Sequence, residues 1–313
     1  MKVIAKTGND ELATVYVAQS DNGKLLEFVE SLPPPFTINE KWVLIISTLY
    51  GCPIKCRFCD AGNYYNGKPT KDELLFQIDY LIKNRFGGET VPSKKFKIQF
   101  SRMGEPTFNP AVLDVLKEIP NRYNAPGFYP SLSTIAPNGT DEFFEELLLI
   151  KNKYYKNKFQ FQYSIHSTDL NQRDWLIPVK KWSFEKMASF GEKFHQGERQ
   201  KITLNFALSI DSIVESNVLL QYFNPDDFLI KITPVNPTYK ALQNKLDSFI
   251  YKPSKQYQTI DNLRSTGYEV IVSIGDLAEN EIGSNCGQHV MNFLKNNVAI
   301  QESYTFPLQQ FLD

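Results

Sequence analysis

The stretch Gly51-Cys52-Pro53-Ile54-Lys55-Cys56-Arg57-Phe58-Cys59 places three cysteines in a C-x3-C-x2-C spacing. It follows the apolar run Trp42 to Ser47, which predicts a strand that delivers a short loop to one end of a sheet. Three thiolates on one tight loop indicate a metal centre. An iron–sulfur cubane normally takes four protein ligands, so this loop would leave one iron free to bind another molecule. A structural zinc site, with Cys286 or a histidine as fourth ligand, is the alternative, although structural zinc usually takes its ligands in close pairs.

The composition describes a globular chain without a strong charge bias. Its 313 residues are 42% hydrophobic, enough for a large core in a single α/β domain. The 34 Lys and Arg residues nearly balance the 35 Asp and Glu residues, so no global basic field favours nucleic-acid backbones. The four cysteines do not form a dispersed disulfide framework, and no signal core or apolar run of about 18 residues occurs. We therefore expect a soluble cytoplasmic protein without a membrane partner.

The N-terminal region predicts a β-hairpin. Apolar and polar residues alternate from Thr14 to Ala18 and again from Leu25 to Val29, with the turn Ser20-Asp21-Asn22-Gly23 between them. We expect residues 1–41 to form a hairpin extension, residues 42–295 the main domain, and residues 296–313 a C-terminal tail.

The main domain alternates between strand and helix patterns. After the strand before the cysteine loop, strands are predicted at Phe96–Phe100, Tyr129–Thr134, Phe159–His166, Ile202–Leu208, Phe228–Thr233 and Tyr268–Ser273. Helices are predicted from Thr70 to the Gly87-Gly88 stop, and at Ala111–Ile119, Glu142–Lys151, Phe184–His195, Ile213–Tyr222 and Gln256–Ser265. This alternation predicts right-handed βαβ crossovers and a parallel sheet. Six or seven units are too few for an eight-stranded barrel, so we expect an α/β partial (β/α)6-type barrel.

Several polar residues follow the predicted strands, at the end where parallel α/β proteins collect their functional groups. In Met103-Gly104-Glu105-Pro106 the glycine lets a ligand approach the backbone, and the carboxylate accepts hydrogen bonds from an ammonium group. Further candidates to orient ribose, sulfonium or carboxylate groups are Ser133, Ser164, His166 and Asn236. Each is ambiguous alone, because a serine at a strand end also caps helices and a histidine is often structural.

Cys286 lies in Ser284-Asn285-Cys286-Gly287-Gln288, after the last predicted strand. It is the only cysteine outside the loop, and the barrel can bring it near the other three. A generic free cysteine of this kind is most often a small buried hydrophobic residue.

Taken together, seven motifs resemble the RlmN/Cfr family of radical S-adenosylmethionine (SAM) adenine methylases. They are G-C-x3-C-x2-C, R-M-G-E-P-T-x-N, L-S-T, S-I-H-S, R-D-x-x-I-P-V, I-T-P-V-N-P and C-G-Q, and they run in order over about residues 12 to 295. In that family one SAM methylates the cysteine of C-G-Q. A radical from a second SAM then activates this methyl group, and its carbon adds to an sp2 carbon of an adenine in RNA.

The resemblance implies roles for specific residues. Cys286 would be the methyl carrier, and Glu27 falls where the family has a glutamate near the substrate base. The [4Fe-4S] cluster would be held by Cys52, Cys56 and Cys59. The SAM site would be lined by Phe58, Gly104, Glu105, Ser133, Ser164, His166 and Asn236.

Two features depart from the family pattern. The family has a second catalytic cysteine seven residues before the first cluster cysteine, and this chain has Ile45 there. Isoleucine cannot perform the thiolate attack that frees the product as a disulfide forms. Family members also carry a helical domain before the hairpin that helps bind RNA, whereas this chain begins at the hairpin.

Three functions are therefore open. The first is transfer of a methyl-derived carbon through Cys286 to an sp2 carbon of an adenine-type base or small heteroaromatic molecule, since such carbons resist polar methylation. The second is hydrogen abstraction from a small molecule without methyl transfer, and the third is a non-catalytic SAM- or RNA-binding homologue. The expected partners are SAM, an RNA or small-molecule substrate, and an external electron donor such as flavodoxin or ferredoxin. An external thiol would replace the one lost at Ile45.

Overall fold

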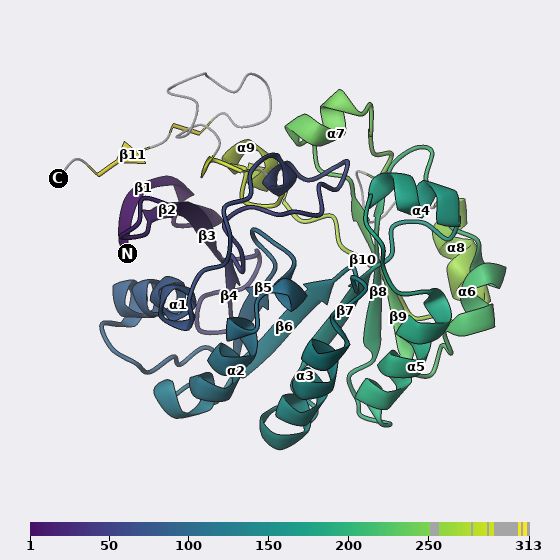
Figure 1. The fold of residues 1–313 in the computed structure, drawn as a ribbon, viewed down its shortest axis with the longest axis horizontal. Helices are drawn as coiled ribbons and strands as arrows, with labels where there is room; N and C mark the ends of the chain where they lie inside the picture. Colours follow the sequence, from purple (N-terminus) through teal and green to yellow (C-terminus); the bar gives the residue numbers. More distant parts are fainter. Residues whose placement is uncertain (251–256, 277, 287, 291–305, 308, 312–313) are drawn as a thin grey trace.

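The computed structural model describes residues 1–250, 257–276, 278–286, 288–290, 306–307 and 309–311. Its centre is a run of parallel strands in chain order (Figure 1). They are β4 (Lys41–Ile46), β5 (Lys95–Phe100), β6 (Phe128–Thr134), β7 (Gln160–Ser164), β8 (Ile202–Leu208), β9 (Phe228–Pro234) and β10 (Val270–Val272). Because β10 lies at one edge of the sheet and does not pair back to β4, the described strands form an open partial barrel, as predicted.

The N-terminal strands extend this sheet beyond β4. They are β1 (Lys2–Asn9), β2 (Ala13–Gln19) and β3 (Leu25–Ser31), each antiparallel to the next. The antiparallel β2–β3 pair matches the predicted hairpin strands, and Gly23 in its turn has a φ of +75°, which favours glycine. β1 was not predicted, and the short β11 (Gln309–Gln310) pairs with it. Since β3 pairs with β4, the hairpin is continuous with the barrel sheet; the predicted domain boundaries stay a prediction.

Helices follow the strands and cover one face of the sheet (Figure 1). The longer ones are α1 (Lys71–Phe86), α2 (Ala111–Arg122), α3 (Asp141–Tyr154), α5 (Phe184–His195), α6 (Ser216–Tyr222) and α8 (Gln258–Ser265). Shorter ones are η1 (Asp60–Asn63), η2 (Pro106–Phe108), α4 (Leu170–Leu176), α7 (Tyr239–Gln243) and α9 (Ala278–Ile282). Helix α1 begins with a Thr70–Glu73 capping box and ends at Gly87 in the left-handed region, as the sequence predicts. No helix among the described residues is both long and apolar enough to cross a membrane.

The predicted helix at residues 213–222 starts too early. Helix α6 begins at Ser216 because the preceding residues hydrogen-bond to another loop: Ile213 N donates to Gln172 Oε1 at 2.9 Å. Glu215 N likewise donates to Thr168 Oγ1 at 2.8 Å. These side-chain acceptors satisfy backbone groups outside the helix, so the helix is shorter than its apolar pattern indicates.

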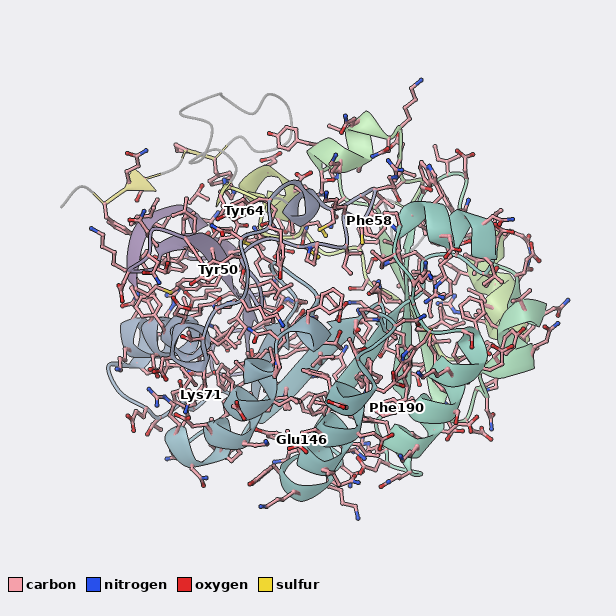
Figure 2. The ribbon with its side chains drawn as sticks, in the orientation of Figure 1. Tyr50, Phe58, Tyr64, Lys71, Glu146 and Phe190 are labelled. Carbon is pink, nitrogen blue, oxygen red and sulfur yellow. The ribbon has the colours of Figure 1, made fainter. Side chains whose placement is uncertain are left out.

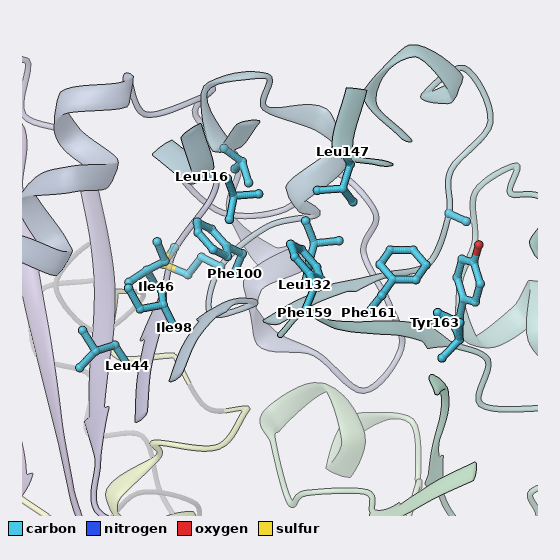
Figure 3. Close-up of a cluster of buried hydrophobic side chains, with 14 of the residues drawn as sticks. Leu44, Ile46, Ile98, Phe100, Leu116, Leu132, Leu147, Phe159, Phe161 and Tyr163 are labelled. Carbon is cyan, nitrogen blue, oxygen red and sulfur yellow. The ribbon is translucent and has the colours of Figure 1, made fainter. Parts of the chain in front are cut away.

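The two faces of the barrel sheet differ in chemistry. Alternate residues such as Ile46, Ile98, Phe100 and Leu132 are buried against the helices in one large apolar core (Figure 3). Strand residues with the opposite parity point to the inner face, and on β5 to β9 most of them are polar. They include Lys97, Gln99, Ser131, Ser133, Gln162, Ser164, Thr203, Asn205, Lys231 and Thr233. A parallel sheet covered on both faces usually has apolar residues throughout, so this inner face is suited to a polar ligand.

Candidate active site

The cysteine loop leaves β4 through a turn that requires glycine. Gly51 has a φ of +87°, and a Cβ there would lie 1.7 Å from the Tyr64 carbonyl oxygen. Cys52 N donates to the carbonyl oxygens of Ala61 at 2.8 Å and Tyr64 at 2.9 Å, which folds the loop back on itself. Figure 2 shows Phe58 and Tyr64 at the end of the sheet away from Lys71 and Glu146, which lie on the helices. The loop therefore lies at the carboxyl end of the parallel strands.

The three loop thiols share a half-buried, largely apolar environment. Cys52 and Cys56 pack against a buried cluster of Ile54, Ile135, Leu176 and Ile177. Burial raises the pKa of the Cys52 thiol to about 12, although a backbone hydrogen bond from Ile54 opposes the shift. Burial also raises the pKa of Cys56 and Cys59, and the charges of neighbouring loop cysteines add to it. Each thiol therefore prefers to be neutral until a cation is bound.

These thiols suit a cluster better than a single ion. Within the part of the chain that the structure describes, no three His, Cys, Asp or Glu side chains are arranged to hold one metal ion. A cubane spreads its ligands over separate irons, so its thiolates need not converge on one point. The donor set fits such a group, because backbone N–H groups of Ile54 and Ala61 hydrogen-bond to Cys52 and Cys59, and such bonds stabilise thiolates.

The Gly104–Glu105 loop is attached to the start of the cysteine loop. Thr48 N and Leu49 N both donate to the Met103 carbonyl oxygen, at 2.8 and 3.0 Å. Gly104 has a φ of +99°, and a Cβ there would lie 2.4 Å from the Leu49 Cβ, so only glycine fits. The sequence-predicted meeting of these two loops at one end of the sheet is thus present in the structure.

The Glu105 carboxylate is buried and already accepts several hydrogen bonds. Its Oε1 accepts from the hydroxyl groups of Thr107 at 2.8 Å and Thr134 at 2.6 Å, and its Oε2 accepts from Ile135 N at 3.1 Å. Burial raises its pKa, and these donors oppose the shift. Since Oε2 has a single donor among the described residues, it can accept another from an ammonium group.

His166 is a structural neighbour of the cysteine loop. Its backbone has a φ of +63°, and its Nδ1 accepts from Ala207 N at 3.0 Å. Its ring meets the ring of Phe58 edge to face, with centroids 4.7 Å apart. Burial, with the nearby Arg173 charge, lowers the pKa of His166 to about 3, so it is neutral at physiological pH. It therefore supports Phe58, next to Cys59, and has no charge to offer a ligand; its predicted part in SAM binding stays a prediction.

Ser133 and Ser164 lie on the inner face, in strands that are direct neighbours. Ser133 Oγ accepts from Gln162 Nε2 at 3.1 Å, while Ser164 lies opposite Asn205 in the register of β7 and β8. Both side chains are partly exposed. They border the same inner face as the two loops, and their contact with SAM stays a prediction.

Cys286 lies near enough to the cysteine loop for its charge to act on Cys59. Asn236 Nδ2 donates to Cys286 Sγ at 3.1 Å, and the Cys286 charge contributes to the raised pKa of Cys59. The short α7, just after Asn236, is fixed to the loop because Lys240 N donates to Asp60 Oδ1 at 2.9 Å. A small cavity beside the thiol is lined by Asn236, Pro237, Thr238, Asn280, Gly283, Asn285 and Cys286.

A buried ion pair holds the segment that carries Cys286. Glu27 and Arg102 are both fully buried and bond through Oε1 and Nη2 at 2.5 Å. Arg102 also donates to the carbonyl oxygens of Gly283 and Ser284, both at 2.8 Å. Glu27 Oε2 accepts from His289 N at 2.7 Å and from Val290 N at 3.0 Å. The pair therefore binds the chain on both sides of Cys286.

This arrangement gives Glu27 a role that the sequence did not predict. It was expected near the substrate base, and the structure surrounds both its oxygens with Arg102 and backbone donors; any contact with a substrate stays a prediction. Arg102 was not singled out. Its position between a predicted strand and a Gly-Glu turn could have indicated a buried arginine, which needs an acceptor nearby. The sequence does not identify that acceptor, because Glu27 lies 75 residues away.

Ile45 occupies the position where a second catalytic cysteine was considered. It lies opposite Val29 and Gln99 in the sheet and packs with Val29 and Ile282 in a small apolar cluster. Ile282 belongs to α9, which leads to Cys286. The Ile45 side chain therefore packs against the segment that leads to Cys286, at the position where the family has a thiol.

The open partial barrel is a fold that this chain shares with a radical SAM enzyme of known structure. The structure superposes on that of a radical SAM methyltransferase from Sphaerobacter thermophilus with a TM-score of 0.67, at 16% identity, over 92% of this chain and 80% of that one. No family model matches the chain.

Curated relatives are similar in sequence over most of the chain. A probable dual-specificity RNA methyltransferase RlmN from Petrotoga mobilis is 24% identical over 286 residues, which cover 88% of this chain and 74% of the relative. One from Chlorobium phaeobacteroides is 25% identical over 295 residues, covering 90% and 75%. The chain is thus similar to RlmN-type methyltransferases over most of its length, which supports the predicted resemblance to this family and the expectation of an enzyme.

Proposed function

We propose that this enzyme transfers a methyl-derived carbon, carried on Cys286, to an sp2 carbon of an adenine-type base or small heteroaromatic molecule. The observation that carries the proposal is the hydrogen bond from Asn236 to Cys286 Sγ at 3.1 Å, beside the loop of three thiols. The relatives named as RNA methyltransferases support the reaction class and an RNA substrate. The position of this thiol supports its assignment as the carrier.

The residues around Cys286 favour its reaction with a methyl donor. Burial raises the pKa of the Cys286 thiol, while the Asn236 hydrogen bond and the charges of Arg102 and Lys231 oppose this shift. In the first transfer the sulfur of Cys286 would attack the methyl carbon of SAM, S-adenosylhomocysteine would leave, and the thiol proton would pass to solvent. The surrounding cations stabilise the thiolate that makes this attack.

The cofactors would be held by residues already described. Cys52, Cys56 and Cys59 would hold a [4Fe-4S] cluster, and Glu105 Oε2 is free to accept from the SAM ammonium group. When bound, the cluster would supply the electron that cleaves SAM to a 5′-deoxyadenosyl radical, with flavodoxin or ferredoxin as the external electron source.

Product release needs a partner that the chain does not contain. All four cysteines of the sequence are assigned to the loop or to Cys286, and Ile45 is apolar. An external thiolate would attack the Cys286 sulfur, so that an S–S bond forms, the bond from Cys286 to the product carbon breaks, and its electron pair goes to the product. A low-molecular-weight thiol is the expected co-reactant.

Mass spectrometry of the peptide that contains Cys286 tests the proposal. The chain is expressed with iron–sulfur assembly proteins and incubated anaerobically with SAM and a reductant, and S-adenosylhomocysteine and 5′-deoxyadenosine are quantified in parallel. We expect a methyl-derived mass increase on Cys286 and formation of S-adenosylhomocysteine. The matched variant Cys286→Ser should retain the loop cysteines and lose the formation of S-adenosylhomocysteine.

One observation favours a second candidate function. Because Ile45 cannot resolve a Cys286 adduct, hydrogen abstraction from a small molecule without methyl transfer also agrees with the chain. In that case 5′-deoxyadenosine would accumulate while Cys286 stays unmodified and no S-adenosylhomocysteine forms. If neither product forms on a cluster-loaded chain, the third possibility, a non-catalytic binding protein, is favoured.

A further inference from the structure

Two lysines lie on the inner face of the sheet, and the proposed function uses only the charge of Lys231, which acts on Cys286. Lys97 is in β5 between the core residues Phe96 and Ile98, so its side chain points to the opposite, inner face. Lys231 is in β9 between the core residues Ile230 and Ile232, with the same consequence. Both side chains are half-buried. The opposite sides of the partial barrel thus each contribute one cation to its interior.

Neither lysine has a counterion among the described residues. No carboxylate in that part of the chain forms an ion pair with Lys97 or Lys231, and neither ammonium group makes a hydrogen bond there. The charged neighbours of Lys97 are cations: burial lowers the pKa of Lys97 well below its usual value, and Lys231, Lys95 and Lys41 lower it further. Removing cations from water without a partner is costly, so a site of this kind is stabilised by an anionic ligand.

Uncharged polar groups complete the surroundings of the two lysines. Asn205 lies opposite Lys231 in the register of β8 and β9, is buried, and has a side-chain oxygen without a hydrogen-bond partner in the described structure. Gln99 and Ser131 lie opposite each other on β5 and β6, next to Lys97 on the same face. Such amide and hydroxyl groups supply hydrogen bonds to phosphate oxygens or to the edge of a base.

Lys231 also lies close enough to the reacting thiol for the two charges to interact. The charge of Lys231 acts on Cys286, and the charge of Cys286 acts in turn on Lys231. An anion between Lys97 and Lys231 would therefore lie on the inner face near Cys286. From there it can fix a substrate whose other end reaches the sulfur.

We propose that the inner face binds the phosphate group of a mononucleotide-sized substrate through Lys97 and Lys231, with its base directed towards Cys286. This inference rests on the proposed function and adds the substrate class. Lysine ammonium groups bind phosphate as point charges, and two of them on facing strands can bracket one phosphate. Because both lie inside the sheet and are half-buried, a free nucleotide suits the site better than a phosphate within a folded RNA.

Isothermal titration calorimetry on the purified full chain tests this inference. Saturating S-adenosylhomocysteine fills the SAM site without donating a methyl group, and the probes are AMP, adenosine and a short oligoribonucleotide. We expect AMP to bind at least about tenfold more tightly than adenosine, and Lys97→Met and Lys231→Met each to remove about tenfold of AMP affinity. Lys94, just before β5, is exposed. The variant Lys94→Met is therefore the matched control and should bind AMP as the unmodified chain does.

Competition by inorganic phosphate gives a second measurement that needs no variant. Phosphate should weaken the binding of AMP and leave that of adenosine unchanged. Equal affinity for AMP and adenosine, variants that bind AMP like Lys94→Met, or binding of the oligoribonucleotide without AMP would each overturn the inference. Binding is measured without reductant or turnover. AMP binding can therefore be absent although Cys286 is methylated, or present although Cys286 stays unmodified, and the two proposals are tested separately.

Discussion

Replacing Arg102 by methionine should release the segment that carries Cys286. The side chain of Arg102 donates to three carbonyl oxygens, those of Gly283, Ser284 and Asn285, and pairs with the Glu27 carboxylate. Arg102→Met removes all these bonds and leaves Glu27 as a buried charge without its cation. Removing one partner of a buried ion pair costs about 3–5 kcal/mol. The exposed pair of Lys193 and Glu145 is the contrast, since breaking such a pair costs at most about 1 kcal/mol.

Two measurements locate this loss. Urea unfolding gives the change in the free energy of unfolding, and hydrogen exchange followed by mass spectrometry reports protection of the peptide that spans residues 278–290. We expect Arg102→Met to lose stability in the stated range, or to lose protection in this peptide first if the segment opens locally. Glu145→Gln is the matched control; it should cost at most about 1 kcal/mol and leave the protection of this peptide unchanged.

A double-mutant cycle shows whether the ion pair itself is responsible. Glu27→Gln combined with Arg102→Met removes both charges, so the double variant should be more stable than the sum of the single losses indicates. The coupling should reach at least about 1 kcal/mol for groups in direct contact. Unfolding energies within about 0.5 kcal/mol of the unmodified chain, with unchanged protection of residues 278–290, would refute the reasoning.

Three further predictions follow from individual side chains. The lowered pKa of Lys97 means that the unfolded chain binds more protons than the folded one at pH values between the folded and unfolded pKa. The free energy of unfolding should therefore rise with pH across this window, and Lys97→Met should make the rise of the urea midpoint with pH smaller. If the urea midpoint of Lys97→Met rises with pH as steeply as that of the unmodified chain, Lys97 is not a buried cation. Gly51→Ala should lower the iron content after cluster reconstitution, because its Cβ would meet a backbone oxygen; normal iron loading would contradict the required turn. Finally, the pKa of His166 is about 3, so activity between pH 5 and 8 should not follow its titration, and His166→Gln should leave the shape of the pH profile unchanged.

The sequence predicts most regular elements because their patterns are long and periodic. The ranges predicted for β8 at Ile202–Leu208 and α5 at Phe184–His195 agree with the structure residue for residue. Helices α7 and α9 span five residues each, too few for an apolar pattern to be recognised. Helix α7 instead depends on the Thr238 cap, whose Oγ1 accepts from Ala241 N at 3.0 Å.

The site residues likewise include some that local motifs predict and some that depend on distant contacts. Local motifs identified the cysteine loop and the Gly104–Glu105 turn, because each motif lies within a few residues of the chain. The contact between Glu27 and Arg102 joins residues 75 positions apart, and no local pattern encodes it. The lysines at 97 and 231 were visible as polar positions at alternate residues of apolar strands. Their common face became clear only when the strand order of the partial barrel was known.

A label transfer experiment tests the central claim, that Cys286 carries the transferred carbon. The cluster-loaded chain is first incubated with SAM that has an isotope-labelled methyl group, and then chased with unlabelled SAM, reductant, an adenine-containing acceptor and a free thiol. The account predicts that the label appears on the Cys286 peptide and then moves to the acceptor, with none on the peptide of Cys286→Ser. Label in the acceptor of the Cys286→Ser variant, or a Cys286 peptide that is never labelled while 5′-deoxyadenosine accumulates, would contradict it.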